Sequence, residues 1–190
     1  MTDQPVRVAV LVSGGGTNLQ ALFDALHDSP LARVARVISN RPDAGALERA
    51  RRAAVPTTVL RDANDSAELL AVLRDAHLVV LAGYLKLVPA PVVARFRGRM
   101  INIHPALLPD FGGPGMYGHH VHEAVLASGA TESGATVHFV DEVFDRGEII
   151  AQERVRIEPN DTPDRLAARV LEAEHRLLPR VVLELARRIA

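Results

Sequence analysis

The sequence contains no cysteine, and this absence removes several kinds of chemistry. A chain without thiols has no disulfide framework, no zinc–thiolate site and no cysteine nucleophile, and it fits a reducing compartment. The sequence also has no large excess of positive or negative charge. It contains 22 Lys and Arg residues and 23 Asp and Glu residues, so its formal net charge is -1. This balance provides no global attraction to nucleic acid or to a membrane surface, although a local anion site is compatible with it.

Long apolar segments are also absent. A membrane-spanning helix needs about 20 consecutive apolar residues, and the longest apolar stretch, residues 78–93, is interrupted by glycine, lysine and proline. The first residues, Met1–Arg7, are polar and lack the basic and apolar regions of a signal peptide. We therefore expect a cytoplasmic protein that binds neither a membrane nor nucleic acid.

Strand-like and helix-like segments alternate along the first half of the chain. Residues 6–12 form an almost continuous apolar run ahead of a glycine cluster, which is typical of a strand buried on both faces of a parallel sheet. Further strands are expected at 34–39, 57–60 and 77–81, and helices at 18–26, 44–53 and 68–74. The alternation predicts βαβ units and an α/β fold with a single doubly wound, mostly parallel, Rossmann-like sheet flanked by helices.

The second half of the chain has a different character. Helices are expected at 89–96 and 119–127, and strands at 100–103, 136–140 and 148–157. Residues 104–118 are rich in proline and glycine and predict a long loop of the kind that carries function. The last helix is expected to begin with Thr162 as its cap and Pro163 at its first position, and Pro179 is expected to kink or split it. No repeat or linker interrupts the sequence, so we predict one domain over residues 1–190.

The turn after the first expected strand reads Ser13-Gly14-Gly15-Gly16-Thr17-Asn18. Glycines let a ligand approach the backbone, and the free amides and dipole at a helix start favour an anion, so phosphate is the natural guest. The Thr17 hydroxyl and the Asn18 amide can add hydrogen bonds. The turn is not a Walker loop, because no Gly-Lys-Ser/Thr follows, and it lacks the third glycine of a dinucleotide fingerprint. A tight turn that binds nothing is the alternative.

A second group of polar residues lies around the long loop. Asn102 and His104 belong to a short apolar strand, and strand alternation puts both on the same side. Asparagine can donate to a developing oxyanion, and histidine suits proton transfer near neutral pH. Asp145 lies in a turn between two later strands, and a carboxylate that reaches the ring would set its tautomer or raise its pKa. Together these residues suit acyl transfer to an amine, while ordinary loop positions for all three remain the alternative.

A group of histidines raises the question of a metal site. His119, His120 and His122 lie close in sequence, and His104 and His138 are further candidates. Adjacent residues on a helix point apart, so His119 and His120 do not readily share an ion, and there is neither a His-Glu-x-x-His motif nor a cysteine. We therefore predict no metal, and instead a histidine that lines a substrate pocket or a solvated helix start.

These motifs occur together in one known family. The chain resembles the phosphoribosylglycinamide formyltransferases, the folate-dependent enzymes of purine synthesis also called GAR transformylases, over almost its whole length. The resemblance rests on stretches that occur in the family's order and near its spacing: Leu11–Gln20, Val80–Leu85, Ile101–Pro109, and Gly134–Val140 followed by Asp145 and Gly147. The Asn-Ile-His-Pro run with the later Asp is specific to the formyltransferase fold, and the Ser-Gly-Gly-Gly-Thr-Asn-Leu turn narrows the resemblance to this family.

The resemblance implies a reaction and a catalytic trio. The formyl group of the cosubstrate 10-formyltetrahydrofolate would move to the amine of glycinamide ribonucleotide, N1-(5-phospho-D-ribosyl)glycinamide. Asn102, His104 and Asp145 match the trio: Asn102 would steady the formyl oxygen, and a protonated His104 would assist it. Asp145 would hold His104 and an ordered water and help to carry the proton away from the attacking amine.

The resemblance also implies two binding regions. The substrate side comprises the phosphate-binding residues, a residue that grips the ribose and a less securely aligned histidine: Gly15, Gly16, Thr17 and Asn18; Glu174; and His122, or else His119. The wall of the folate pocket, next to Asn102, comprises Leu85, Lys86, Leu87, Val88, Val93 and Met100. The phosphate-binding half would cover about residues 1–100 and the folate and catalytic half about residues 80–190, with antiparallel strands toward the C-terminal part. We expect a monomer or a weak homodimer.

Two departures from the family pattern and three alternatives stay open. Lys86 stands where the family often has arginine, so contact with the folate's glutamate tail is expected to be weaker or differently shaped. The loop at residues 110–122 is longer than in the shorter bacterial members.

A formyltetrahydrofolate hydrolase shares the trio but reads Asn-Ile-His-His and usually has a preceding regulatory domain. A methionyl-tRNA formyltransferase needs a further C-terminal domain and a more basic chain, and a phosphometabolite-binding protein without chemistry would not need the intact trio.

Overall fold

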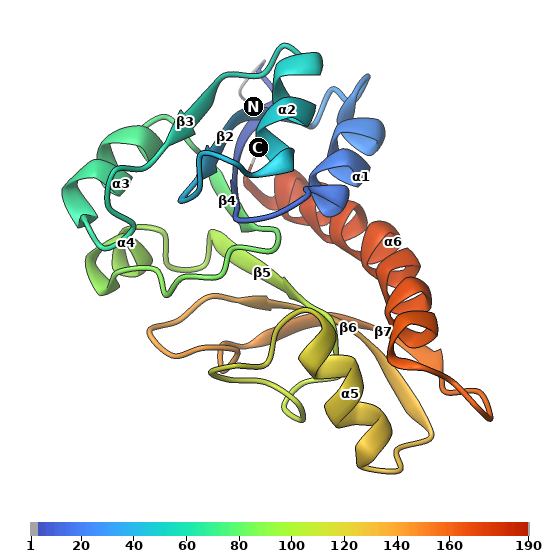
Figure 1. Cartoon of the computed structure of the whole chain (residues 1–190). Helices are drawn as coiled ribbons and strands as arrows, with labels where there is room; N and C mark the ends of the chain where they lie inside the picture. Colours follow the sequence, from blue (N-terminus) through green and yellow to red (C-terminus); the bar gives the residue numbers. More distant parts are fainter. Residues whose placement is uncertain (1–3, 190) are drawn as a thin grey trace.

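The computed structural model describes residues 4–189, so the first three residues of the Met1–Arg7 segment and Ala190 lie outside the described part of the chain. Strands and helices alternate along it (Figure 1). Their bounds are β1 (Val6–Val12), α1 (Thr17–Leu26), β2 (Ala32–Ser39), α2 (Gly45–Arg52), β3 (Thr57–Val59), α3 (Ser66–Leu73), β4 (Leu78–Leu81), α4 (Ala90–Arg95), β5 (Met100–His104), α5 (His119–Ala127), β6 (Glu132–Phe139), β7 (Ile149–Arg156) and α6 (Pro163–Ile189). Every expected segment corresponds to one of these elements.

The strands form one sheet in the order β3-β2-β1-β4-β5-β6-β7. The neighbours from β3 to β5 are parallel, whereas β6 pairs with both β5 and β7 in antiparallel fashion. The chain first runs outward from β1 to β3 and then returns to β4 on the other side of β1, so the sheet has a topological switch point between β1 and β4. The predicted doubly wound, mostly parallel sheet with antiparallel strands toward the C-terminal part is confirmed.

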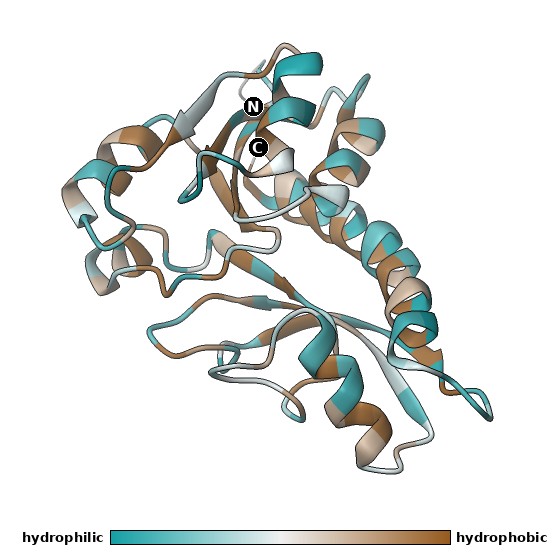
Figure 2. Ribbon diagram, in the orientation of Figure 1, coloured by the Kyte–Doolittle hydropathy of each residue, from teal (hydrophilic) through white to brown (hydrophobic). Residues whose placement is uncertain are grey.

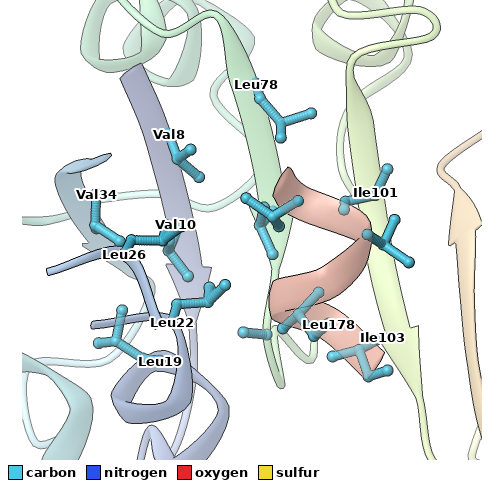
Figure 3. Packing of buried hydrophobic residues seen from close by; sticks show 14 of the residues in the cluster. Val8, Val10, Leu19, Leu22, Leu26, Val34, Leu78, Ile101, Ile103 and Leu178 are labelled. Atoms are coloured by element: carbon cyan, nitrogen blue, oxygen red, sulfur yellow. The ribbon is translucent and has the colours of Figure 1, made fainter. Parts of the chain in front are cut away.

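The helices cover both faces of the sheet, and β1 shows how. Val8 and Val10 belong to the core formed with α1, α2 and α6, while Ala9 and Leu11 belong to the core formed with α3 and α4. Figure 3 shows Val8 and Val10 on the same side as the labelled leucines of α1, and Figure 2 shows apolar residues on the central strands and polar ones on the outer turns of α2 and α6. The strand is therefore buried on both faces, as its continuous apolar run predicted.

Helix α6 begins as expected, but its proline does not split it. The Arg165 backbone N–H donates to the Thr162 hydroxyl at 3.3 Å, and Pro163 is the first helical residue. Pro179 was expected to kink or split the helix. The split does not occur, since the helix is unbroken over 27 residues, and the kink stays a prediction. Pro179 and its neighbour Leu178 are buried on the core face, and this packing outweighs the loss of one backbone hydrogen bond. Neither α6 nor any other helix of residues 4–189 is long and apolar enough to cross a membrane.

Strand β6 begins four residues earlier than expected, at Glu132 instead of Thr136. Its polar and glycine-containing start lacks a strand pattern, yet these residues pair with β7. Gly134 approaches β7 so closely that a Cβ atom there would collide with the carbonyl oxygen of Glu153. The glycine that obscured the strand in the sequence is therefore the residue that permits the close pairing.

Candidate active site

A cleft of about 550 Å³ lies at the carboxyl ends of the central parallel strands. The segments that follow β1, β4 and β5 line it, together with the start of α5, the turn between β6 and β7, and α6. This edge of the sheet adjoins the switch point between β1 and β4, where open α/β sheets bind their ligands. The topology therefore brings residues that are far apart in sequence to one place.

Ser13 joins the loops that follow β1, β2 and β4. Its hydroxyl donates to the Asn40 side-chain oxygen at 2.6 Å and accepts a hydrogen bond from the Leu85 amide at 2.9 Å. Its own amide donates to the Gly83 carbonyl at 3.0 Å. Because Ser13 is buried, these bonds fix the glycine turn to the wall of the cleft.

The glycine turn enters α1 with unusual backbone geometry. Gly16 caps the helix with a φ of 75°, in the left-handed region, and a Cβ atom there would lie 2.6 Å from the Cβ of Ala46. Only glycine fits both requirements. The backbone amides of residues 14–17 donate to no group within residues 4–189. Free amides at the start of a helix suit a bound anion.

The predicted phosphate-binding residues face two different hollows. Asn18 lines the main cleft, whereas Thr17 lines a second, more open hollow beside Arg49 and His175. Gly15 and Gly16, which precede Thr17 and Asn18 in the turn, line neither of the two hollows. Adjacent helical residues point about 100° apart, which separates the two side chains.

Asn18 and Glu174 meet across the cleft, although 156 positions separate them in sequence. The Asn18 side-chain amide donates to a Glu174 carboxylate oxygen at 3.3 Å. Glu174 is 7% exposed, and burial raises its pKa from 4.5 to about 7, an effect that the Asn18 hydrogen bond only partly opposes. The Asn18 side-chain oxygen is itself buried without a partner in the described part of the chain. Both side chains therefore have unused capacity for hydrogen bonds from a polar ligand.

The structure brings Asn102, His104 and Asp145 together in the same cleft. The Asp145 carboxylate lies 3.5 Å from His104 Nδ1 and accepts hydrogen bonds from Asn102 Nδ2 at 3.4 Å and from the Gly113 amide at 2.9 Å. His138 joins them, with its Nε2 atom 3.1 Å from Asn102 Nδ2 and 3.5 Å from the Asp145 carboxylate. The carboxylate thus accepts from two amides and lies between two imidazole rings.

The protonation of His104 reflects two opposing effects. Burial lowers its pKa, while the Asp145 carboxylate and the Phe111 carbonyl oppose this, and the net pKa lies below the usual value. The sequence resemblance implied a protonated ring, and Asp145 was expected to raise its pKa. Asp145 does act in that direction, but burial outweighs it. The Phe111 carbonyl, 2.8 Å from Nε2, can only accept, so Nε2 carries a hydrogen atom. In the neutral ring Nδ1 is then free to take up a proton beside Asp145.

Asp145 is held in its charged form. Burial raises its pKa, but the hydrogen bond from His138, the charge of His104 and the Gly113 amide outweigh burial and lower the pKa below its ordinary value. A charged carboxylate next to a buried imidazole stabilises the imidazolium that forms when the ring accepts a proton. The pair can therefore take a proton from a reacting group and release it again.

Two residues at this site have strained backbones. Phe111 and Asp145 have φ angles of 57° and 56°, a region that side chains larger than glycine rarely adopt. The strain places the Phe111 carbonyl against His104 and the Asp145 carboxylate against the Gly113 amide. Such conformations persist where the surrounding structure enforces them, and they concentrate at functional sites.

His122 is the predicted substrate-side histidine that the structure places inside the cleft. His122 is 5% exposed, and its Nδ1 atom has no hydrogen-bond partner within residues 4–189. Burial and the nearby His119 and His104 lower its pKa. His119 reaches the rim of the cleft, whereas His120 is exposed and lies 3.5 Å from Glu123. No group of three or more potential ligands that could hold a metal occurs among the described residues.

The predicted folate wall divides into a lining and a core. Leu85, Lys86, Leu87 and Val88 line the cleft, and Leu85 and Leu87 are 47% and 44% exposed. Val93 and Met100 do not line it: they are buried behind the wall, in the core shared with α3 and α4. Apolar residues across the cleft, which sequence reasoning missed, complete the lining: Met116, Val140, Val143, Phe144 and Leu171.

Other functional residues had weak signals in the sequence. His138 was considered only as a metal ligand, but it is paired with Asn102 across β5 and β6, and only the strand register reveals this. The contributions of Phe111 and Gly113 come from their backbones, so their residue types carry no signal. Ser13 and Asn40 each follow a strand that ends at the same sheet edge, a position that would have identified them.

Comparisons with known proteins show a family to which the chain is similar. Residues 6–182 match the family described as Formyl transferase. The chain is 47% identical to "Phosphoribosylglycinamide formyltransferase, chloroplastic" of Arabidopsis thaliana, over 93% of this chain and 64% of that protein. It is 38% identical to the phosphoribosylglycinamide formyltransferase of Haemophilus influenzae, over 93% of this chain and 85% of that protein.

Solved structures show the same likeness. The crystal structure of glycinamide ribonucleotide transformylase 1 from Symbiobacterium toebii has a TM-score of 0.88 and 41% identity, and the match covers 96% of this chain and 88% of that one. The chain spans less than two thirds of two plant relatives that it matches, 64% and 61% of their lengths. The match over residues 6–182 and the similarity to the Haemophilus protein nevertheless settle the family. The chain belongs to the formyl transferase family.

Proposed function

We propose that this protein transfers the formyl group of 10-formyltetrahydrofolate to the amine of N1-(5-phospho-D-ribosyl)glycinamide. The products are formylglycinamide ribonucleotide and tetrahydrofolate, a step of de novo purine biosynthesis. Membership of the formyl transferase family and the names of the plant and bacterial relatives support this reaction. The observation that carries it is the convergence of Asn102, His104 and Asp145 in a cleft that also contains Asn18 and Glu174.

The proposed chemistry begins when the substrate amine attacks the formyl carbon. A carbon–nitrogen bond forms, and the formyl oxygen becomes an oxyanion. Asn102 stabilises this oxyanion by donating an amide hydrogen from Nδ2, the atom that donates to Asp145 and lies 3.1 Å from His138 Nε2. Collapse of the intermediate then breaks the bond to the folate nitrogen N10.

The reaction moves one proton overall, from the attacking amine to N10 of the folate. His104 Nδ1 and the Asp145 carboxylate, 3.5 Å apart, are the groups proposed to accept this proton and return it. The lowered pKa of His104 keeps its ring ready to accept, and the charged Asp145 stabilises the protonated ring. Because these side chains supply the oxyanion donor and the proton carrier, the proposed step uses no metal ion, and a chelator is expected to leave the rate unchanged.

The substrate is proposed to bind with its phosphate at the start of α1. The free amides of Gly15, Gly16 and Thr17 would donate to the phosphate oxygens. Asn18 and Glu174 would hold the ribose, since both have unused hydrogen-bonding capacity at the cleft. His122, a buried residue of α5 that lines the same cleft, would contact the glycinamide end.

The formylfolate is proposed to occupy the apolar part of the cleft. Leu85, Leu87 and Val88 provide a surface for its flat ring system, and the exposed Lys86 would meet the negatively charged glutamate tail. Val93 and Met100 would act only from behind, by supporting this wall. Lysine offers one compact charge where arginine offers a planar fork, so the contact with the tail is expected to be looser.

The proposal also covers the domain organisation, the partners, the compartment and the oligomeric state, all of which are inferred from the sequence. We propose one formyltransferase domain over residues 1–190, with the halves described above, and small-molecule partners alone. Two plant relatives carry the word chloroplastic in their names, so family membership alone does not determine the cellular compartment. For this protein we predict a cytoplasmic location. Sedimentation analysis would distinguish the expected monomer or weak homodimer from larger assemblies.

The decisive assay combines the protein with 10-formyltetrahydrofolate and glycinamide ribonucleotide. Formation of formylglycinamide ribonucleotide and tetrahydrofolate in equal amounts, with no reaction when the amine is omitted, is the expected result. Release of formate without the amine would indicate a hydrolase. Absence of turnover together with tight binding of the phosphorylated substrate would indicate a binding protein.

A further inference from the structure

Arg49 of α2 contacts the glycine turn from the side opposite the free amides. Its Nε atom donates to the Gly15 carbonyl at 2.8 Å, and its Nη1 atom donates to the Gln20 side-chain oxygen at 3.3 Å. The stem of the side chain packs near Gly16, where the Cδ atom would lie 3.4 Å from an added Cβ. Arg49 therefore bridges the turn and the first turn of α1.

All three glycine carbonyls of the turn are already occupied. The Ala46 amide donates to the Gly14 carbonyl at 3.0 Å, Arg49 donates to that of Gly15, and the Gln20 amide donates to that of Gly16 at 2.9 Å. In a planar trans peptide the C=O and N–H groups point in opposite directions. The amides of Gly15 and Gly16 therefore point away from α2, and Gly15 is exposed while Gly16 is partly exposed.

The charge of Arg49 has no carboxylate partner within 4.0 Å in the described part of the chain. Arg51 and Arg52 on the same helix differ, because both form ion pairs with Glu48. A guanidinium that donates to a carbonyl also polarises that peptide group and makes its N–H a stronger donor. The Gly15–Gly16 peptide is therefore both oriented and polarised by an arginine whose charge is not neutralised.

We propose that Arg49 is a positioning residue for the phosphate of the substrate. Through the Gly15 carbonyl it holds the Gly15–Gly16 peptide in place, so that the polarised Gly16 N–H donates to a phosphate monoester dianion. The identity of the complete substrate rests on the proposed function, whereas the preference for a phosphate monoester rests on the turn itself. Arg49 acts through the peptide and does not touch the reacting atoms.

The test compares Arg49→Met with the matched control Arg52→Met on the same helix. The probe is ribose 5-phosphate, measured by calorimetry without folate, so that the result does not depend on turnover. Loss of the charge-assisted hydrogen bond is expected to weaken ribose 5-phosphate binding about tenfold in Arg49→Met. The control is expected to bind within about twofold of the wild type, because its charge is already paired at the surface.

Two further readouts separate positioning from a general structural role. The KM for glycinamide ribonucleotide is expected to rise in Arg49→Met with kcat and the KM for formylfolate nearly unchanged, as for an interaction made equally in ground and transition states. The Gly16 amide resonance, which shifts when ribose 5-phosphate binds to the wild type, is expected to shift less in the variant. Arg49→Lys, which keeps a charged donor, is expected to restore part of the affinity, and it serves as the test variant if Arg49→Met does not fold.

Several outcomes would overturn the proposal. Wild-type affinity for ribose 5-phosphate in the Arg49 variants would do so, as would an equal loss in Arg52→Met or no measurable binding by the wild type. A different outcome is also informative: the protein binds ribose 5-phosphate in an Arg49-dependent way but transfers no formyl group. This result would refute the proposed function and support the role of Arg49.

Discussion

Glu174 should make the stability of this protein depend on pH in a specific direction. Glu174 lies on α6 and is 7% exposed, and its one protein hydrogen bond within residues 4–189 comes from Asn18. Burial raises its pKa from 4.5 to about 7, despite the opposing hydrogen bond. The folded protein therefore holds this proton over a pH range in which the unfolded chain has already released it.

The sign and size of the effect follow from this difference. Between pH 4.5 and about 7 the folded state binds one more proton than the unfolded state, so the free energy of unfolding falls as the pH rises. The complete pKa shift of Glu174 corresponds to a change of about 3 kcal/mol in the free energy of unfolding. About 2.5 kcal/mol of this change falls between about pH 5 and pH 8. Glu174→Gln cannot ionise and removes this contribution.

Urea unfolding of the wild type and Glu174→Gln at the two pH values measures the effect. The stability of the wild type relative to the variant should fall by about 2.5 kcal/mol between about pH 5 and pH 8. Glu172→Gln, at an exposed position of the same helix, controls for the loss of a negative charge. Parallel pH profiles for wild type and Glu174→Gln would refute the account of a buried, mostly protonated carboxyl group.

Three more predictions concern the trio, the substrate and the turn. His104→Ala and Asp145→Asn should each lower kcat at least about 100-fold in the formyl-transfer assay, and near-normal turnover would remove that residue from the proposed trio. Asn18→Ala should chiefly raise the KM for glycinamide ribonucleotide, about tenfold, and an unchanged KM would count against its role. Gly16→Ala should destabilise the fold by about 2 kcal/mol or more in urea, because the new Cβ meets Ala46 and the φ is left-handed; wild-type stability would contradict that geometry.

Much of the fold could be predicted from the sequence because the central strands are buried on both faces. Residues 6–12 combine a continuous apolar run with a following glycine turn, and few structures other than a parallel α/β sheet suit both features. The errors lie where a local rule competes with tertiary packing. Pro179 does not split α6 because core contacts hold the helix, and the start of β6 was hidden because Gly134 serves close pairing rather than a turn.

The candidate site was predictable in its residue types but not in its arrangement. Asn102 and His104 lie on one strand, so their common side follows from alternation. The approach of Asp145 depends on a strained turn, and the contact of His138 with Asn102 depends on the register of β5 and β6. Apolar residues gave the least information, since Val93 and Met100 pack in the core while Leu85 and Leu87 line the cleft, and hydrophobicity is common to all four.

Transfer of a formyl group from a folate to an amine in this cleft is the reaction that we propose. The most direct measurement follows a carbon-13 label from the formyl group of 10-formyltetrahydrofolate by NMR, with and without glycinamide ribonucleotide. The label is expected to appear as a new formamide on the ribonucleotide, and the formylfolate signal is expected to stay unchanged when the amine is absent. Labelled formate in either sample, or a formylfolate signal that persists with both substrates present, would contradict the proposed reaction.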